Sequence, residues 1–290
     1  MKKKIFIILV SAVLVAAFVA ATVSLVLDLI RFGKKETFKI KCEAGFQNKY
    51  SATSANGTEL ESLYADLEGT DLNAHEKNVR VLKELGISDE IVESMYAEDI
   101  DKILADALYV QVQERYFIID EKGKAVNIEK DAFMEQYHEG ASDVACDCMR
   151  ITLVRVYLDP SSNDGEKGWF DFHVWYEWLM PDARKHEYKV SISAEDISWG
   201  DCLQSDYSSG YYYTVKDSDG NERQYSERID GSACQFIYNG CMYQGEIPEN
   251  GIDMTVTYLR YYLSGKCAVR RPAEDYIFNV SAKYESNGQH

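Results

Sequence analysis

The chain has 290 residues and a formal net charge of −17 at pH 7. This length allows a membrane anchor together with one or two domains that each bury a core. The acidic balance, with no dense basic run beyond the N-terminal flanks, excludes a nucleic-acid-binding surface, because such surfaces need clusters of Lys and Arg.

Residues 1–35 are predicted to form an N-terminal transmembrane anchor or signal segment. The basic start Met1-Lys-Lys-Lys precedes the apolar run Ile5–Leu27, whose polar members are Ser11, Thr22 and Ser24. A helix over this run spans about 35 Å, enough to cross a hydrocarbon core of about 30 Å. No clear Ala-x-Ala cleavage site follows, so residues 5–27 are predicted to hold the chain in the membrane. Secretion after signal cleavage is the alternative.

Cysteine usage favours a single-pass topology in the cell membrane with the C-terminal domain outside the cytoplasm. An even set of cysteines in an exported domain predicts disulfide bonds, although the sequence does not choose among the pairings. The six candidates for these disulfides are Cys146, Cys148, Cys202, Cys234, Cys241 and Cys267.

Residues 36–58 are predicted to be a juxtamembrane connector that contains a short strand at Thr37–Cys42. Residues 59–140 form an α-rich membrane-proximal region in which one helix ends near Gly86 and the next begins at Ser88. Gly86 suits a left-handed C-cap, and Ser88 suits an N-cap because its hydroxyl can accept a backbone hydrogen bond. Tyr109–Asp120 and a following short segment are predicted to pair as a β-hairpin.

Residues 149–285 are predicted to form an antiparallel β-sandwich, Ig-like or jelly-roll-like, which makes the whole chain an α+β protein. Short alternating segments joined by turn-forming residues are typical of this architecture. Tyrosine, with 15 of its 21 residues from Tyr157 onward, suits half-buried strands. The expected strands are Met149–Leu158, Gly168–Leu179, Glu187–Ser193, Tyr211–Lys216, Glu222–Arg228, Gln235–Tyr238, Asp253–Leu263 and Tyr276–Tyr284.

The segment Gly168–Leu179 is predicted to be the central core strand of the sandwich. Its even positions are all apolar, whereas its odd positions include Asp171, His173 and Glu177. This alternation indicates a strand with one face in the core. An adjacent carboxylate and imidazole can act as general acid and base, but no serine or cysteine is placed to complete a mechanism. No catalytic residue is therefore assigned, and the interpretation leans away from an enzyme.

Neither a metal site nor a cofactor is predicted. The loop that starts at Asp217 resembles the beginning of a calcium-binding loop, but Glu222 stands where glycine is needed and Arg228 where the bidentate glutamate is needed. Cys146 and Cys148 lie close in sequence, but the five histidines form no cluster beside them. Structural roles are favoured for these residues.

The segment Tyr176-Glu-Trp-Leu179, followed by Pro181 and Arg184, resembles a strand segment of uncharacterised exported or membrane-anchored proteins of Gram-positive bacteria. The helix opening Leu85-Gly-Ile-Ser-Asp-Glu is also similar to such proteins. One residue fewer separates Leu179 from Pro181 than in their pattern. The resemblance implies export and a β domain, and it implies no catalytic activity.

The sequence thus predicts a non-enzymatic surface interaction module that binds an unknown protein or glycan ligand. The aromatic density without a catalytic set motivates this prediction. The candidate contact residues, expected to be exposed, are Trp169, Trp175, Tyr211, Tyr212 and Tyr213. One alternative is an extracellular glycan hydrolase that uses carboxylates of the β domain. Another is an immunity or assembly factor held at the membrane.

Overall fold

A computed structural model describes most of the chain beyond the predicted anchor. The described residues are 37–51, 57–120, 122–136, 147–158, 168–179, 187–195, 197–198, 207–217, 219–237, 239–246, 255–269 and 274–289. The predicted anchor, residues 1–35, lies outside them. Residues Lys39–Gly288 form one compact unit, and the description below concerns that unit alone.

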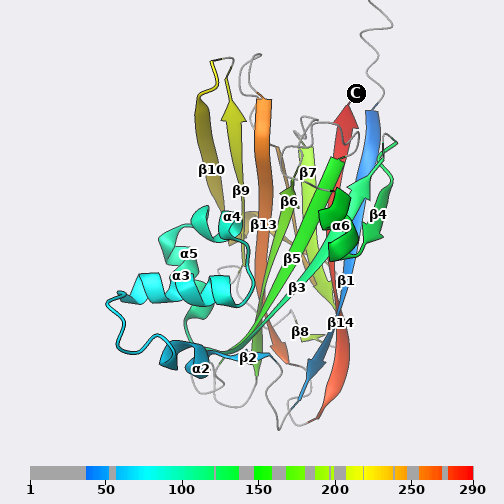
Figure 1. Cartoon of the computed structure of the whole chain (residues 1–290). Coiled ribbons are helices and arrows are strands. Elements are labelled where there is room, and N and C mark those ends of the chain that lie inside the picture. The colour runs from blue at the N-terminus through cyan, green and yellow to red at the C-terminus, as the bar shows by residue number, and fades with distance from the viewer. Residues whose placement is uncertain are drawn as a thin grey trace, which may run out of the picture. The chain divides into compact units, whose positions relative to one another are not determined.

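The first β-sheet, sheet A, contains five described strands (Figure 1). In spatial order they are β1 (Thr37–Tyr50), β14 (Tyr276–Gln289), β7 (Glu187–Ala194), β12 (Gly240–Glu246) and β11 (Gln235–Ile237). Strand β7 pairs antiparallel with both β14 and β12. Ion pairs between Lys41 and Glu285 (3.9 Å) and between Glu43 and Lys283 (3.0 Å) join β1 to β14. The outer face of this end of sheet A is therefore a paired, polar surface.

The second sheet, sheet B, contains nine described strands, and its strand pairs are antiparallel. Seven of them lie in the order β10 (Glu222–Asp230), β9 (Tyr207–Lys216), β13 (Thr255–Val269), β6 (Trp169–Trp178), β5 (Asp147–Leu158), β3 (Ala107–Ile119) and β2 (Thr58–Glu59). The short strands β4 (Ala125–Ile128) and β8 (Ile197–Ser198) pair with β3 and β13. A 3₁₀ turn, η3 (Gly231–Ala233), follows β10.

The two sheets pack through the even-numbered face of β6, as the alternation predicts. Phe170 contacts Phe278 with ring centroids 5.5 Å apart, and Trp178 contacts Tyr284 edge-on at the same distance. The hydroxyl of the fully buried Tyr176 donates a hydrogen bond to the carbonyl of Ser191 in sheet A (2.9 Å). The prediction of a β-sandwich with this segment as a core strand is confirmed. Its finer assignment as Ig-like or jelly-roll-like stays a prediction.

A helical layer covers the other face of sheet B (Figure 1). It consists of α2 (Leu60–Ala65), α3 (Ala74–Glu84), α4 (Asp89–Glu93) and α5 (Ala97–Leu104), whereas α6 (Lys130–Gln136) packs on β3. Gly86 has a φ of 93°, and the Ser88 hydroxyl accepts a hydrogen bond from the Ile91 N–H (3.3 Å). Both predicted helix signals are therefore confirmed. Helix residues such as Val81, Ile91 and Ile103 form one apolar cluster with sheet B.

The domain boundaries differ from those predicted. Strand β1 fills much of the predicted connector 36–58, and β3 lies within the predicted α-rich region 59–140, yet both are strands of the sandwich. Neither segment is separate from the β domain 149–285. The reason is that β3 pairs with β5 along nearly its whole length, which places the helices of the preceding segment directly on sheet B.

The described residues support neither the predicted membrane anchor nor the predicted disulfide bonds. None of the helices there is long and apolar enough to span a membrane. The structure records no disulfide bond among the described cysteines, all of which are buried, and Cys146 and Cys202 lie outside the described residues. Cys148, Cys234, Cys241 and Cys267 lie within the core.

The expectation that Trp175 is exposed is wrong. Trp175 lies on the odd face of β6 and is 1% exposed, because the helical layer packs against it. The expectation of a free odd face fails for a physical reason: alternation shows that a strand has two faces, but it does not show what covers the second. Trp169, on the same face, is only partly buried.

We therefore expect Trp175→Ala to lower the free energy of unfolding by about 3–5 kcal/mol, because it opens a cavity between sheet B and the helices. Thermal and urea unfolding of the full-length chain measure this loss. Trp169→Ala is the matched control, with an expected loss of about 1 kcal/mol. Equal stability of the Trp175→Ala variant and the unchanged protein would contradict the burial of this ring.

Candidate functional site

The three polar residues on the odd face of β6 have different surroundings. Glu177 is fully buried, His173 is 3% exposed, and Asp171 is partly exposed. Strands β5 and β13 flank β6, so each of these residues has one cross-strand neighbour on either side. For Glu177 both neighbours are arginines, Arg150 and Arg260.

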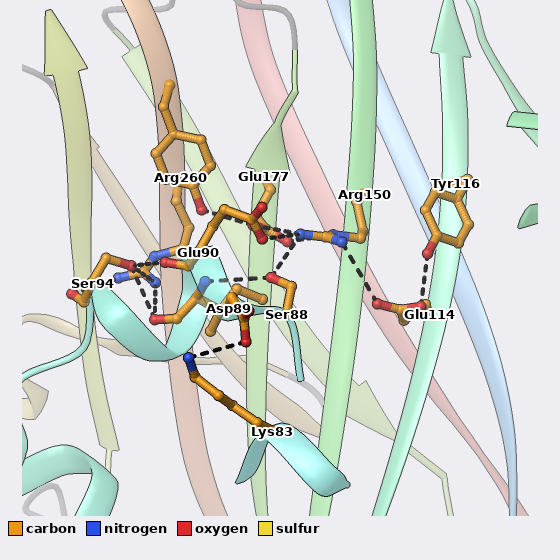
Figure 2. Close-up of polar contacts among 12 residues, drawn as sticks. Lys83, Ser88, Asp89, Glu90, Ser94, Glu114, Tyr116, Arg150, Glu177 and Arg260 are labelled. Carbon is orange, nitrogen blue, oxygen red and sulfur yellow. Dashed lines mark hydrogen bonds and ion pairs between the residues drawn. The ribbon is translucent and has the colours of Figure 1, made fainter. Parts of the chain in front are cut away.

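Glu177 forms a buried ion pair with Arg150 (Figure 2). The Arg150 Nε and Nη2 atoms donate to the two carboxylate oxygens of Glu177 at 2.7 and 3.0 Å, and the Tyr258 hydroxyl donates to Oε1 at 2.7 Å. Burial lowers the pKa of Arg150, but the charge and hydrogen bonds of Glu177, together with nearby Glu114 and Tyr116, outweigh burial and raise it. Both Glu177 oxygens are thus occupied by partners within the chain, so this carboxylate has a structural role.

The same two arginines fasten α4 to sheet B. Arg150 Nη2 donates to the Ser88 hydroxyl at 2.8 Å, which places it at the start of α4. Arg260 donates to the carbonyls of Ile91 (2.9 Å) and Ser94 (3.2 Å) and also to the Ser94 hydroxyl, at the end of α4. We call this arrangement the arginine clamp (Figure 2). Cations are favourable at a helix C-terminus because its carbonyls carry partial negative charge.

Nearer the other end of β6, sheet B and α5 enclose a polar cavity of about 170 Å³, which we call the His173 pocket. One wall comes from α5 and the turn after it, and the other wall comes from four strands of sheet B. The lining residues are Asp99, Lys102, Ala105, Asp106, Leu158, Asp171, His173, Ser208, Tyr262, Ser264 and Lys266.

His173 is held by two neighbours in this pocket. Its Nδ1 lies 2.8 Å from the Tyr262 hydroxyl, and its Nε2 lies 3.2 Å from Asp171 Oδ2. The second contact is close enough for an ion pair, but it is not aligned as a hydrogen bond, so Nε2 makes none. The imidazole also stacks with Trp175 and Tyr262 at centroid distances of 6.1 Å. These contacts fix the ring plane.

The serines of the pocket interact with one another rather than with His173. The hydroxyls of Ser208 and Ser264 are 2.8 Å apart, although Ser264 is the cross-strand neighbour of His173. Burial raises the pKa of Tyr262, and the two serine hydroxyls oppose this change. Among the described residues the pocket therefore shows no serine hydrogen-bonded to a histidine base, which nucleophilic catalysis of the serine type requires.

The helical wall of the pocket is tied to the edge of sheet B by charge. Arg228 of β10 lies 2.9 Å from Asp99 and 3.7 Å from Glu98 of α5. The Tyr96 hydroxyl, at the start of α5, is 2.8 Å from the Ser226 hydroxyl in β10. These contacts are more exposed than the arginine clamp, and they join α5 to β10, the edge strand of sheet B.

Of the five aromatic residues predicted to bind a ligand, Trp175, Tyr211 and Tyr212 line one hollow beside α5, whereas Trp169 and Tyr213 do not line it. Tyr211 is 8% exposed and Tyr213 is 3% exposed, so the expectation of exposure is wrong for both, as it is for Trp175. Tyr213 is buried against Tyr225 of the neighbouring strand, with ring centroids 5.0 Å apart. Trp169 borders the His173 pocket, because the ammonium of the lining residue Lys266 lies 5.2 Å from its ring. Tyr212 is half-buried beside Arg260.

Sequence reasoning found Asp171 and His173 but missed their neighbours in the pocket. Ser264, Tyr262 and Lys266 alternate along β13, which is a period-2 signal that the sequence does carry. Nothing local indicates that α5 would lie opposite them, because that contact joins segments more than 60 residues apart in sequence. The pocket is a product of tertiary packing.

The described residues contain no group of three or more His, Cys, Asp or Glu side chains arranged to hold a metal ion. At the loop that resembles a calcium site, the Asp217 carboxylate accepts hydrogen bonds from the N–H groups of Asp219 (3.0 Å) and Asn221 (2.8 Å). Strands β9 and β10 pair on either side of it. The structure therefore shows a hairpin turn at this position.

No protein-family model and no curated protein matches the sequence. Solved structures that match include a carbohydrate-binding module, TmCBM61, in complex with β-1,4-galactotriose, at 18% identity and a TM-score of 0.17; the match covers 61% of this chain and 86% of that one. A bsmA homolog from Methylobium petroleophilum PM1 matches at 9% identity and a TM-score of 0.22; the match covers 75% of this chain and 94% of that one. The Fe(II)/α-ketoglutarate-dependent dioxygenase TqaL matches at 7% identity and a TM-score of 0.21; the match covers 80% of this chain and 86% of that one. At these identities and TM-scores, none of the three supports an inference about this chain.

Replacement of Glu177 by alanine should lower the free energy of unfolding by about 3–5 kcal/mol, because it leaves the Arg150 cation buried without its partner. Urea unfolding of the full-length chain measures the effect. Glu98→Ala serves as the control, since Glu98 is exposed and its contact with Arg228 is worth about 0–1 kcal/mol. If the two substitutions lower the free energy of unfolding equally, Glu177 and Arg150 do not form a buried ion pair.

Proposed function

We propose that this protein is a non-enzymatic, membrane-anchored extracytoplasmic module that binds one sugar unit of a glycan in the His173 pocket. The observation that carries this proposal is the convergence of hydrogen-bonding side chains from a helix and from sheet B on one cavity. Concave sites with a few convergent polar groups are the default binding sites of proteins.

The size of the pocket favours a small ligand unit. Its volume of about 170 Å³ is below the roughly 300–1,000 Å³ of sites that hold drug-sized molecules. Since a water molecule occupies about 30 Å³ in the liquid, the ligand would displace about five or six waters. A large cofactor does not fit this space, whereas a single sugar ring is of the appropriate order.

The charges of the pocket favour an uncharged ligand. Asp99 is neutralised by Arg228, which leaves the two carboxylates of Asp106 and Asp171 against the two ammonium groups of Lys102 and Lys266. The remaining formal charge is balanced, so neither an anion nor a cation is selected by net charge.

The chemistry of the lining groups favours a ligand rich in hydroxyls. Carboxylates only accept hydrogen bonds, ammonium groups only donate them, and the hydroxyls of Ser208 and Ser264 do both. A sugar hydroxyl also does both, so it can satisfy each kind of group. Leu158, Ala105 and the ring of Tyr262 add apolar surface beside these polar groups, which also suits a sugar because a sugar ring presents C–H groups as well as hydroxyls.

The glycan-hydrolase alternative has one supporting observation, because Asp99 and Asp171 line the pocket from opposite walls. Such an enzyme needs one of its two carboxyl groups protonated as the general acid. The Asp99 carboxylate is already engaged in an ion pair with Arg228 at 2.9 Å, so one of the two candidate carboxylates has a partner within the chain. Binding without hydrolysis is therefore the function that the geometry supports better.

In the binding test, saturation-transfer NMR measures the binding of galactose, glucose and N-acetylglucosamine to the full-length chain. At least one sugar is expected to bind, and Asp171→Asn should weaken its affinity about 10–100-fold through loss of a charge-assisted hydrogen bond. Lys283→Ala, on the outer face of sheet A, should leave the affinity unchanged.

Three results would overturn this proposal. The first is the absence of binding by all three sugars. The second is equal binding by the Asp171→Asn variant with its near-UV circular dichroism unchanged. The third is displacement of the bound sugar by a free amino acid, which would place a zwitterion in the pocket instead. Release of shorter products from a β-1,4-linked trisaccharide would favour the hydrolase.

Localisation is part of the proposal and rests on the apolar run Ile5–Leu27. Protease added to intact cells should digest the compact unit Lys39–Gly288, because the protease can reach it from outside. A cytoplasmic marker protein should stay intact. Full protection of the unit in intact cells, together with its digestion after lysis, would show the opposite topology.

A further inference from the structure

We infer that the ligand is a chain rather than a single sugar, and that its next unit lies on Tyr96 beside the His173 pocket. This inference rests on the proposed function and names the ligand class of the same site more closely. It starts from a second hollow along α5, which we call the Tyr96 groove. The residues of the groove used below are Tyr96, Asp99, Tyr211, Tyr212 and Tyr262.

The Tyr96 groove adjoins the His173 pocket. Asp99 from α5 and Tyr262 from β13 line both hollows, so the two share one wall residue on the helix and one on the sheet. The His173 pocket lies toward the end of α5, at Lys102 to Asp106, whereas the groove lies toward its start, at Tyr96. Together they follow α5 along its length, which is the geometry that an extended ligand needs.

The groove differs from the pocket in chemistry. Its volume is about 40 Å³, close to that of one water molecule, so a sugar ring does not fit inside it. It offers an aromatic surface instead, because Tyr96 is 45% exposed and Tyr212 is half-buried nearby. A second unit would therefore lie against the Tyr96 ring rather than inside a cavity.

The Tyr96 ring is held in place before any ligand arrives. Its hydroxyl is bonded to Ser226, which joins the start of α5 to β10. The Tyr211 hydroxyl likewise donates to Glu227 at 2.7 Å. An aromatic ring that is already fixed loses little conformational entropy on binding, so it adds affinity efficiently. An exposed aromatic ring beside a polar pocket is the kind of surface on which the C–H face of a sugar packs.

The test compares each monosaccharide with its β-1,4-linked trimer on the full-length chain, by isothermal titration calorimetry or NMR. The trimer of the sugar that binds should bind at least tenfold more tightly than the monomer. Tyr96→Ala should remove this gain and leave the monomer affinity unchanged. Tyr96→Phe should keep most of the gain, because it retains the ring and loses only the contribution that the bond to Ser226 makes by fixing that ring.

Phe236→Ala is the control, since Phe236 is a similarly exposed aromatic residue on β11 of the other sheet. The inference is overturned if the trimer binds no more tightly than the monomer, or if Tyr96→Ala keeps the gain or weakens both ligands equally. In each of those cases the monomer still binds, so the proposed function survives. Failure of both monomer and trimer to bind would instead overturn the proposed function.

Discussion

Burial of β6 on both faces is the constraint from which the rest of the unit follows. An edge or surface strand can leave its polar residues in water, but a strand covered on both sides must supply a partner for each. The partner of Glu177 is Arg150 on the adjacent strand, with the Tyr258 hydroxyl as a second donor. Sheet B therefore carries arginines on the strands at either side of β6, and these arginines determine what can lie above them.

The helical layer depends on those arginines. A helix of five residues such as α4 has no appreciable stability of its own, because nucleation costs more than so few hydrogen bonds return. Arg150 and Arg260 hold its two ends, and Ile91 packs into the apolar cluster beneath it. Because only three residues separate the end of α4 from the start of α5, the clamp also sets where α5 lies. The buried ion pair thus positions one wall of the His173 pocket without taking part in it.

The sequence predicted the strands well and their surroundings less well. Alternation placed β6 and its core face, and Gly86 and Ser88 marked helix ends, because these signals are local. The alternation from Lys39 to Tyr50 was also present, yet only its first residues were assigned to a strand. Contacts between segments that are distant in the sequence bury Trp175 and place Asp99 and His173 in the lining of one pocket. No local pattern carries that information, so the wall of the pocket opposite His173 was not predicted.

The odd face of β6 therefore has two roles, and the extent to which the helical layer covers each part of it decides which role that part has. Where the helical layer closes over Glu177, the carboxylate is satisfied by groups of the chain itself, and its chemistry is used for stability. Where α5 leaves space beside Asp171 and His173, the polar groups are only partly satisfied, since His173 Nε2 makes no aligned hydrogen bond. Polar groups of this kind gain from a partner that comes from outside the chain. The same residue types on one strand thus differ in function because of what lies above them, and not because of their identity.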